Sequence, residues 1–217
     1  HDALPIWSLI ALNIINIITD DVYFLQGARH LLNEAAENHA VLYNDINASG
    51  LRAVVRSFAT YDQKVILYIH CIRKRRVLLR LVAAYNLQVF VITHCKVSDC
   101  NNDKDPMIIP SFLSKKEFLQ KIKSAKRSVY RKSSQRSKRI FKGLSAGASV
   151  KDLAETLNIT QKAVYAIKNH TIKKFGFKST KMNGFLLCRD LLEMNEIGLR
   201  YKRIVDGNFV SMNARRS

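Results

Sequence analysis

The first half of the chain alternates short apolar runs with segments in which apolar residues recur at helical spacing. Two continuous β-branched and aromatic runs, KVILYIH at 64–70 and QVFVIT at 88–93, predict strands that are buried on both faces. Because strands that alternate with helices form parallel sheets with crossover helices, we expect an α/β fold here. Further strands are expected at 13–18, 40–43 and 107–112, and helices at 22–37, 51–58, 75–85 and 115–127.

The second half has a purely helical pattern. Helices are expected there at 135–143, 150–157, 161–175 and 181–195. The segment between the two halves is rich in Lys, Arg and Ser and has little apolar content. We therefore expect three parts, namely an α/β domain at 1–120, a basic linker at 121–133 and an all-α domain at 134–217.

Charge separates the two halves more sharply than hydrophobicity does. The 217 residues include 36 Lys and Arg against 17 Asp and Glu, a formal net charge of +19. Residues 1–120 carry 13 basic and 11 acidic side chains, whereas residues 121–217 carry 23 basic and 6 acidic ones. A nearly neutral domain joined to a domain of net charge +17 indicates that only the second one binds a polyanion.

The apolar runs and the cysteines exclude some classes of protein. The longest apolar stretch, at 4–18, is interrupted by Pro5 and by two Asn, and a membrane span needs roughly 20 apolar residues. Four scattered cysteines do not resemble a disulfide-stapled secreted scaffold, and the chain starts without a basic signal segment. We therefore expect a cytoplasmic protein, and we expect the first six or so residues, HDALPI, to be non-native.

Residues 144–179 predict two helices around a tight turn. Leu153 and Leu157 face inward, and Ala154 lies where the two helices approach closely. In the turn, Ile159 fills the core and Thr160 can cap the next helix with its hydroxyl. The inner stripe of that next helix is expected to contain Val164, Ile167, Thr171 or Ile172, and Phe175.

The outer face of this second helix is polar and basic. It carries Lys162, Tyr165, Lys168, Asn169 and Lys173. Lys can bind guanine or phosphate and Asn can bind adenine, so such a face suits the major groove of DNA. Two other interpretations are a helical hairpin with merely solvated lysines, which explains neither the turn nor the charge, and an RNA-binding module, for which no aromatic stacking platform is evident.

The segment resembles the LuxR/FixJ-type helix-turn-helix. Two positions depart from the usual pattern: Ile167 replaces the usual His, and Ser137 falls near the usual acidic residue of the first helix. The resemblance implies that Tyr165, Ala166 and Asn169 read bases and that 181–192 is the dimerisation helix. Matching residues are Gly147, Ser149, Lys151 to Ala154, Leu157, Ile159, Thr160, Val164, Lys174, Phe175 and Ser179; the DNA-binding set is Thr160, Lys162, Tyr165, Ala166, Lys168, Asn169, Lys173, Lys174 and Lys178.

The first half resembles the receiver domain of response regulators, which implies a flavodoxin-like, doubly wound parallel sheet. Asp20 and Asp21 match the metal-binding acidic pair, Thr93 the hydroxyl position and Lys115 the lysine after the fifth strand. The phosphate-acceptor position is occupied by Ile69 or His70, with no carboxylate nearby, so we expect no phosphorylation-driven switching. The matching residues form either a vestigial network that holds the sheet edge, or a weak Mg²⁺ site or small-ligand pocket.

Two further groups of residues allow alternative interpretations. His70-Cys71 and His94-Cys95 end strands that should be neighbours, and Cys100 follows closely. These side chains could bind Zn²⁺ or sense redox state, but no CxxC pair is present and single cysteines are commonly inert core residues. The basic run at 73–76 is either a solvated face or a contact with a partner or DNA.

We therefore expect a bacterial transcription regulator that binds DNA and is not an enzyme, with no cofactor and no metal. It resembles enterobacterial capsule-synthesis accessory regulators, which implies action as a homodimer or as a heterodimer with a conventional LuxR-type response regulator. The alternative is an interaction protein whose receiver-like domain sequesters or modulates a partner regulator, with only non-specific DNA binding.

Overall fold

A computed structural model of the chain describes residues 13–33, 39–58, 63–97, 107–124, 130, 132–178 and 181–213. Its first part contains a five-stranded, fully parallel sheet with the strand order β2-β1-β3-β4-β5. This order is the flavodoxin-like one, so the predicted fold class is confirmed. The strands are β1 (Asn13–Thr19), β2 (His39–Asp45), β3 (Gln63–Tyr68), β4 (Gln88–Thr93) and β5 (Met107–Pro110).

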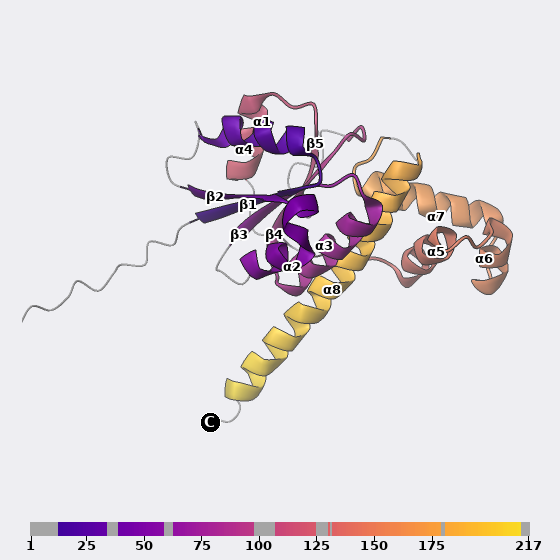
Figure 1. The fold of residues 1–217 in the computed structure, drawn as a ribbon. Helices are drawn as coiled ribbons and strands as arrows, with labels where there is room; N and C mark the ends of the chain where they lie inside the picture. Colours follow the sequence, from indigo (N-terminus) through magenta and orange to yellow (C-terminus); the bar gives the residue numbers. More distant parts are fainter. Residues whose placement is uncertain are drawn as a thin grey trace, which may run out of the picture.

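Helices cover both faces of this sheet (Figure 1). On one face, α1 (Val22–Asn33) and α4 (Lys115–Ser124) bury apolar residues such as Leu25 and Ile122 against alternate strand residues. On the other face, α2 (Ile46–Ser57) and α3 (Ile72–Ala84) bury residues such as Val54 and Leu79. β3 is buried at nearly every position because it lies between these two layers, which agrees with its continuous apolar run.

In the residues that the structure describes, the second part has four helices and no strand, apart from an isolated β-bridge between Phe177 and Val97 of the first part. The helices are α5 (Gln135–Ser145), α6 (Val150–Thr156), α7 (Gln161–Lys174) and α8 (Met182–Asn213). Four helices were expected at these places, and the expectation is confirmed. α8 is much longer than the helix predicted at 181–195, because the later residues continue the helix without Pro.

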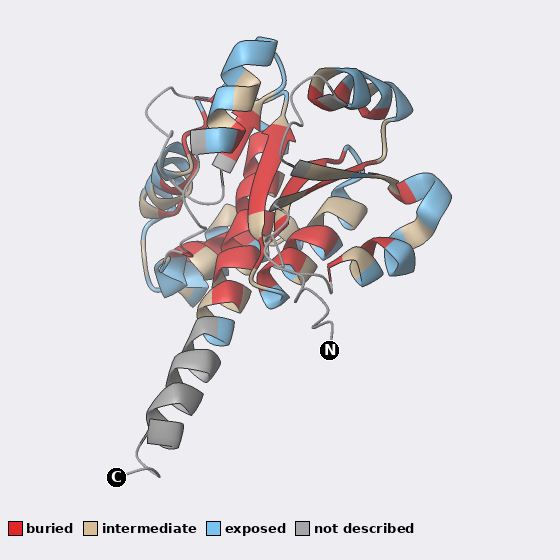
Figure 2. Ribbon diagram, turned by 90° about the vertical axis from the view of Figure 1, so that its left-hand side faces the viewer, coloured by how far each residue is buried: buried red, intermediate tan, exposed pale blue. Residues whose placement is uncertain are grey.

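The two parts share one apolar core. α8 packs against α3 of the sheet domain and also against α5 and α7, so it lies between the two parts (Figure 1). A single cluster of buried residues runs from Val65 and Leu79 to Phe141, Ile172 and Leu191. In Figure 2 the buried positions extend from the central strands into the helices beside them.

The basic run at 73–76 contributes directly to this contact. Nη2 of Arg75 lies 2.9 Å from the Asp190 carboxylate, and Nε of Arg76 donates to Glu193 at 2.8 Å. Asp190 is fully buried and also receives a hydrogen bond of 2.9 Å from Nε of Arg189. Arg75 and Arg76 therefore connect α3 to α8. These two of the four basic residues are neither simply solvated nor available to contact DNA.

Several expectations concern the ends and the linker. Residues 1–12, which include HDALPI, lie outside the described residues, as do 125–129 and 131 of the expected linker. α4 continues to Ser124, so the first four residues of the range expected as a linker are helical. In the described part of the chain, no helix combines the length and the apolar character that a membrane span requires.

Candidate nucleic-acid interface

The turn between α6 and α7 is built from local hydrogen bonds. Ser149 and Asp152 form a reciprocal capping box at the start of α6. After α6, Asn158 adopts a φ of +50°, a left-handed conformation that Asn tolerates better than most residues. Oγ1 of Thr160 then accepts a hydrogen bond of 3.1 Å from the backbone N–H of Ala163, which starts α7. The predicted cap at Thr160 is confirmed.

A small apolar core holds α5, α6 and α7 together. Ile140, Ala154 and Val164, one from each helix, are buried against one another. The closest approach is at Gly143 of α5, where an added Cβ would lie 2.5 Å from Cδ2 of Leu153. The predicted inward positions on α6 and α7 are confirmed, and the helix that they pack on is now identified as α5.

The departure from the usual pattern at Ser137 has a structural explanation. The Ser137 side chain is buried, and its hydroxyl accepts a hydrogen bond of 3.2 Å from Oγ1 of Thr171 on α7. Oγ of Ser137 is also 2.8 Å from that of Ser134, the N-cap residue of α5. Uncharged hydroxyl groups therefore link α5 to α7 at the position where the family pattern has an acidic residue.

The outer face of α7 is exposed to solvent. Tyr165 is 49% exposed, and Lys162, Ala166 and Asn169 are exposed beside it. Lys168 is only partly exposed, and its ammonium lies 5.3 Å from the centre of the Tyr165 ring in a cation–π contact. Of the nine residues predicted to bind DNA, the eight besides Lys168 are exposed, namely Thr160, Lys162, Tyr165, Ala166, Asn169, Lys173, Lys174 and Lys178.

Further basic side chains are exposed on the other two helices of this module. Arg136 and Arg139 are exposed one turn apart on α5, and Lys151 is exposed at the start of α6. None of them belonged to the predicted set, because the motif comparison concentrated on the second helix. The net charge of the second half was the signal that could have identified them.

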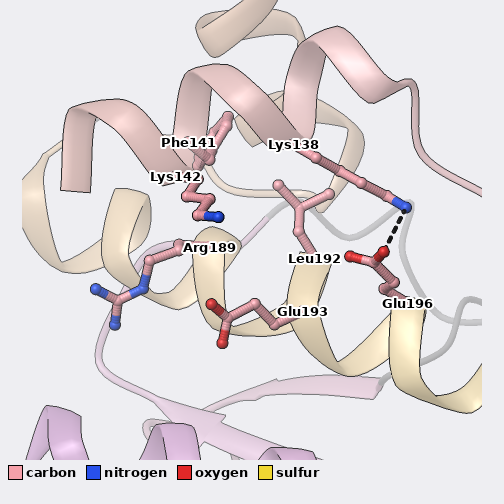
Figure 3. Close-up of a pocket in the computed structure, with 7 residues that line it drawn as sticks. All are labelled: Lys138, Phe141, Lys142, Arg189, Leu192, Glu193 and Glu196. Carbon is pink, nitrogen blue, oxygen red and sulfur yellow. Dashed lines mark ion pairs between the residues drawn. The ribbon is translucent and has the colours of Figure 1, made fainter. Parts of the chain in front are cut away.

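The helix expected to mediate dimerisation is covered within the chain. Phe185, Leu191 and Leu192 of α8 are buried in the core that the two parts share. A pocket of about 200 Å³ lies between α5 and α8 (Figure 3). Lys138 and Lys142 of α5 and Glu193 and Glu196 of α8 are among the residues that line it. Lys138 and Glu196 form an ion pair of 3.7 Å across it, so charged contacts as well as apolar ones hold α5 on α8.

At the carboxyl edge of the sheet, the acidic pair bonds to backbone groups. The two carboxylate oxygens of Asp20 accept hydrogen bonds from the backbone N–H groups of His70 at 2.9 Å and Cys71 at 2.8 Å. Burial of Asp20 raises the pKa of its carboxyl, but these two N–H groups and His70 outweigh burial and hold the pKa below its ordinary value. Asp21 accepts from the backbone N–H groups of Tyr23 and Phe24 and thereby caps α1.

The remaining receiver-like positions lie at the same edge. Oγ1 of Thr93 at the end of β4 accepts a hydrogen bond of 3.2 Å from the N–H of Cys95, and Lys115 is the first residue of α4. Ile69 and His70, at the phosphate-acceptor position, follow β3 directly. The structure thus brings the predicted residues to one edge, where Asp21 caps α1 and Asp20 binds the backbone that leads into α3.

Two histidines also meet at this edge. Nε2 of His94 is 2.5 Å from the Tyr68 hydroxyl, its Nδ1 is 2.7 Å from Oγ of Ser111, and its ring stacks on that of His70. Among the described residues, no group of three His, Cys, Asp or Glu is placed to hold a metal ion. Cys100 lies outside the described residues, and burial raises the pKa of the Cys188 thiol far above its ordinary value.

No protein-family model and no curated protein matches the sequence. The solved structure of the response regulator RcsB in complex with DNA is similar, with 16% identity, a TM-score of 0.45 and coverage of 82% of this chain and 97% of that one. The response regulator StyR is similar too, with 13% identity, a TM-score of 0.36 and coverage of 86% of this chain and 99% of that one. FixJ from B. japonicum has 13% identity, a TM-score of 0.35 and coverage of 84% of this chain and 98% of that one. At these identities the likeness concerns the course of the backbone and not individual residues.

Proposed function

We propose that this protein is a sequence-specific, DNA-binding transcription regulator that acts by binding and not by catalysis. The observation that carries the proposal is the exposed outer face of α7, which presents Tyr165, Ala166 and Asn169 to solvent between lysines. A helix held this way on two others can enter the major groove, where its side chains reach base edges. The lysines of α7 and the exposed basic residues of α5 and α6 supply phosphate contacts and affinity from counterion release.

The same proposal includes independence from phosphorylation. The phosphate-acceptor position holds Ile69 or His70, and both oxygens of Asp20 are occupied by backbone N–H groups. Incubation with a small acyl phosphate and Mg²⁺ should therefore leave the mass of the protein and its affinity for DNA unchanged.

One helix-turn-helix module reads few base pairs, so useful specificity requires two of them. We propose that the protein acts as a homodimer or as a heterodimer with a LuxR-type response regulator. Because the first part of α8 is covered by α3 within the chain, pairing through that surface would require α3 to move away. Light scattering of the protein alone and with such a regulator, each on DNA, distinguishes the two assemblies.

The direct test is selection of duplexes from a random library by the intact protein, at near-physiological salt and with excess competitor DNA. We expect a short motif to be enriched. Replacing Tyr165 and Asn169 with Ala should abolish the enrichment while most of the salt-dependent affinity remains. Tyr23→Ala is a matched control, because this tyrosine is 81% exposed on α1, in the sheet domain.

The rival function is an interaction protein whose sheet domain sequesters a partner regulator. In that case the duplexes retained would show no motif, and substitutions on α7 would change retention only through charge. Retention without a motif, and with the same behaviour for the Tyr165→Ala and Tyr23→Ala variants, would therefore overturn sequence-specific reading.

A further inference from the structure

The outer face of α7 has a definite order along its length. At 100° per residue, Lys162, Ala166, Asn169 and Lys173 fall on one side of the helix, and Tyr165 is next to them. The two lysines are about 16 Å apart along the helix axis. The major groove is about 12 Å wide, so the lysines can reach phosphates on its two sides while the three residues between them face the bases.

These three central residues share a chemical preference. Asn binds adenine with two hydrogen bonds, to N6 and N7, and a methyl or aromatic group packs against the C5 methyl of thymine. Asn169 supplies the amide, and Ala166 and the half-exposed Tyr165 ring supply the apolar contacts. None of the three carries the cationic donor that guanine O6 and N7 select.

The cations nearby do not change this preference. α7 contains no Arg, which is the usual reader of guanine. The ammonium of Lys168 lies 5.3 Å from the centre of the Tyr165 ring, and this cation–π contact holds the ring in place. Lys162 and Lys173 lie at the two ends of the face, beyond the central bases.

We infer that α7 reads A·T base pairs at the centre of each half-site, with Asn169 on an adenine and with Tyr165 and Ala166 on thymine methyl groups. This inference rests on the proposed function and specifies its ligand. It assigns specificity to three side chains and leaves affinity to the lysines around them.

The test uses the duplex that the intact protein enriches from a random library. Uracil in place of central thymines removes only the methyl group, and 7-deazaadenine in place of central adenines removes only the N7 acceptor. We expect each change to weaken binding roughly 5- to 150-fold. The same changes outside the half-sites are the matched control and should have little effect.

A change of specificity gives an independent readout. Asn169→Arg replaces the adenine-reading amide with a guanine-reading fork at an exposed position. Selection with this variant should enrich a motif in which one central A·T pair has become G·C. Circular dichroism and the melting temperature confirm that the variant is folded.

The outcomes separate the inference from the proposed function. A motif with a G·C centre, or a duplex that is insensitive to uracil and 7-deazaadenine, overturns the A·T inference and leaves sequence-specific binding in place. Enrichment of no motif overturns both. An A·T centre whose affinity falls with both base analogues supports both.

Discussion

At the scale of single residues, Asp20 has an unusual role for a carboxylate at the edge of a parallel sheet. Its side chain is only 8% exposed, and each oxygen accepts a backbone N–H from one of the two residues just before α3. The carboxylate therefore fixes the turn that leads into α3, whose positive dipole end also favours a negative charge nearby. This use of Asp20 explains how the residue can remain at this edge without a phosphate acceptor beside it.

The pH dependence of stability should reveal this role. The two N–H groups hold the pKa of Asp20 below its ordinary value, so its stabilisation is present above about pH 4 and is lost as the pH falls through the folded-state pKa. Asp20→Asn should lower the free energy of unfolding by about 1–3 kcal/mol at neutral pH. The gap between the two proteins should narrow on acidification.

Urea unfolding of both proteins between pH 7 and pH 2 measures this gap. Glu155→Gln, at an exposed position of α6, is the control and should show almost no gap at any pH. A gap for Asp20→Asn that stays constant down to pH 2 would show that the charge of Asp20 is not the source of the stabilisation.

Gly143 is a second residue with a clear expectation. A Cβ at this position would lie 2.5 Å from Cδ2 of Leu153, so Gly143→Ala should force α5 and α6 apart and cost about 1–3 kcal/mol. Gly27→Ala in α1 is the matched control, because nothing lies within 4 Å of its added Cβ. It should stabilise the protein by about 0.5–1 kcal/mol, the usual gain of Ala over Gly in a helix.

The denaturant midpoints of the Gly143→Ala and Gly27→Ala variants test these two stability changes. Equal changes would mean that the contact between Gly143 and Leu153 is not tight. The Gly143 variant should also bind DNA less well at temperatures near its melting transition, because α6 and α7 are supported by α5.

At the scale of elements, α8 is the feature that the sequence pattern predicted least well. Strands such as β4 were predicted at their observed positions, because a strand buried on both faces has a continuous apolar run. The turn before α7 was predictable as well, because its caps are local in sequence. The partner of a helix face is not local, so the periodicity of 181–195 could not indicate that α3 covers it.

The same limit applies to the charged residues. Asp190 and Glu193 are spaced as neighbours on one helix face, and their partners Arg75 and Arg76 are 115 and 117 residues away in the sequence. Only the fold shows that they pair. On α7, by contrast, helical spacing predicted the exposed Lys162, Tyr165, Asn169 and Lys173, and the family resemblance added Ala166. Most of the candidate site was therefore predictable, and the basic residues of α5 were not.

Removing one partner of the Arg75–Asp190 pair should be strongly destabilising. The pair is almost fully buried, with Arg75 12% exposed and Asp190 0% exposed, and an uncompensated buried charge costs about 3–5 kcal/mol. In the Arg75→Ala variant, Asp190 keeps Arg189 as its partner. The loss of unfolding free energy for this variant should therefore lie at the lower end of that range. Arg73→Ala, at an exposed position of the same helix, should be nearly neutral.

A double-mutant cycle of Arg75→Ala and Asp190→Ala measures the coupling from unfolding free energies. The double variant should be less destabilised than the sum of the two single variants. Additive effects would mean that the Arg75–Asp190 pair does not hold α3 to α8.

At the scale of the whole molecule, the sheet domain and the helical domain behave as one packed body. A shared core from Leu79 to Leu191 and the ion pairs of α3 with α8 connect them. We expect urea to unfold the intact chain in one transition, with the same midpoint by circular dichroism and by hydrogen exchange in both parts. Two separate midpoints would contradict a shared core.

The proposed function assigns affinity and discrimination to different parts of the molecule. If the protein binds DNA as we propose, the basic second half provides affinity for any sequence, and the central residues of α7 discriminate between sequences. These two contributions depend differently on salt, because counterion release weakens with added salt and base contacts do not.

The most direct measurement is the equilibrium affinity of the intact protein for its enriched duplex and for a permuted duplex of equal composition, over a series of salt concentrations. Both affinities should fall in parallel with the logarithm of the salt concentration, and the enriched duplex should stay roughly 10³-fold tighter throughout. Equal affinities for the two duplexes at every salt concentration would contradict sequence-specific reading by α7.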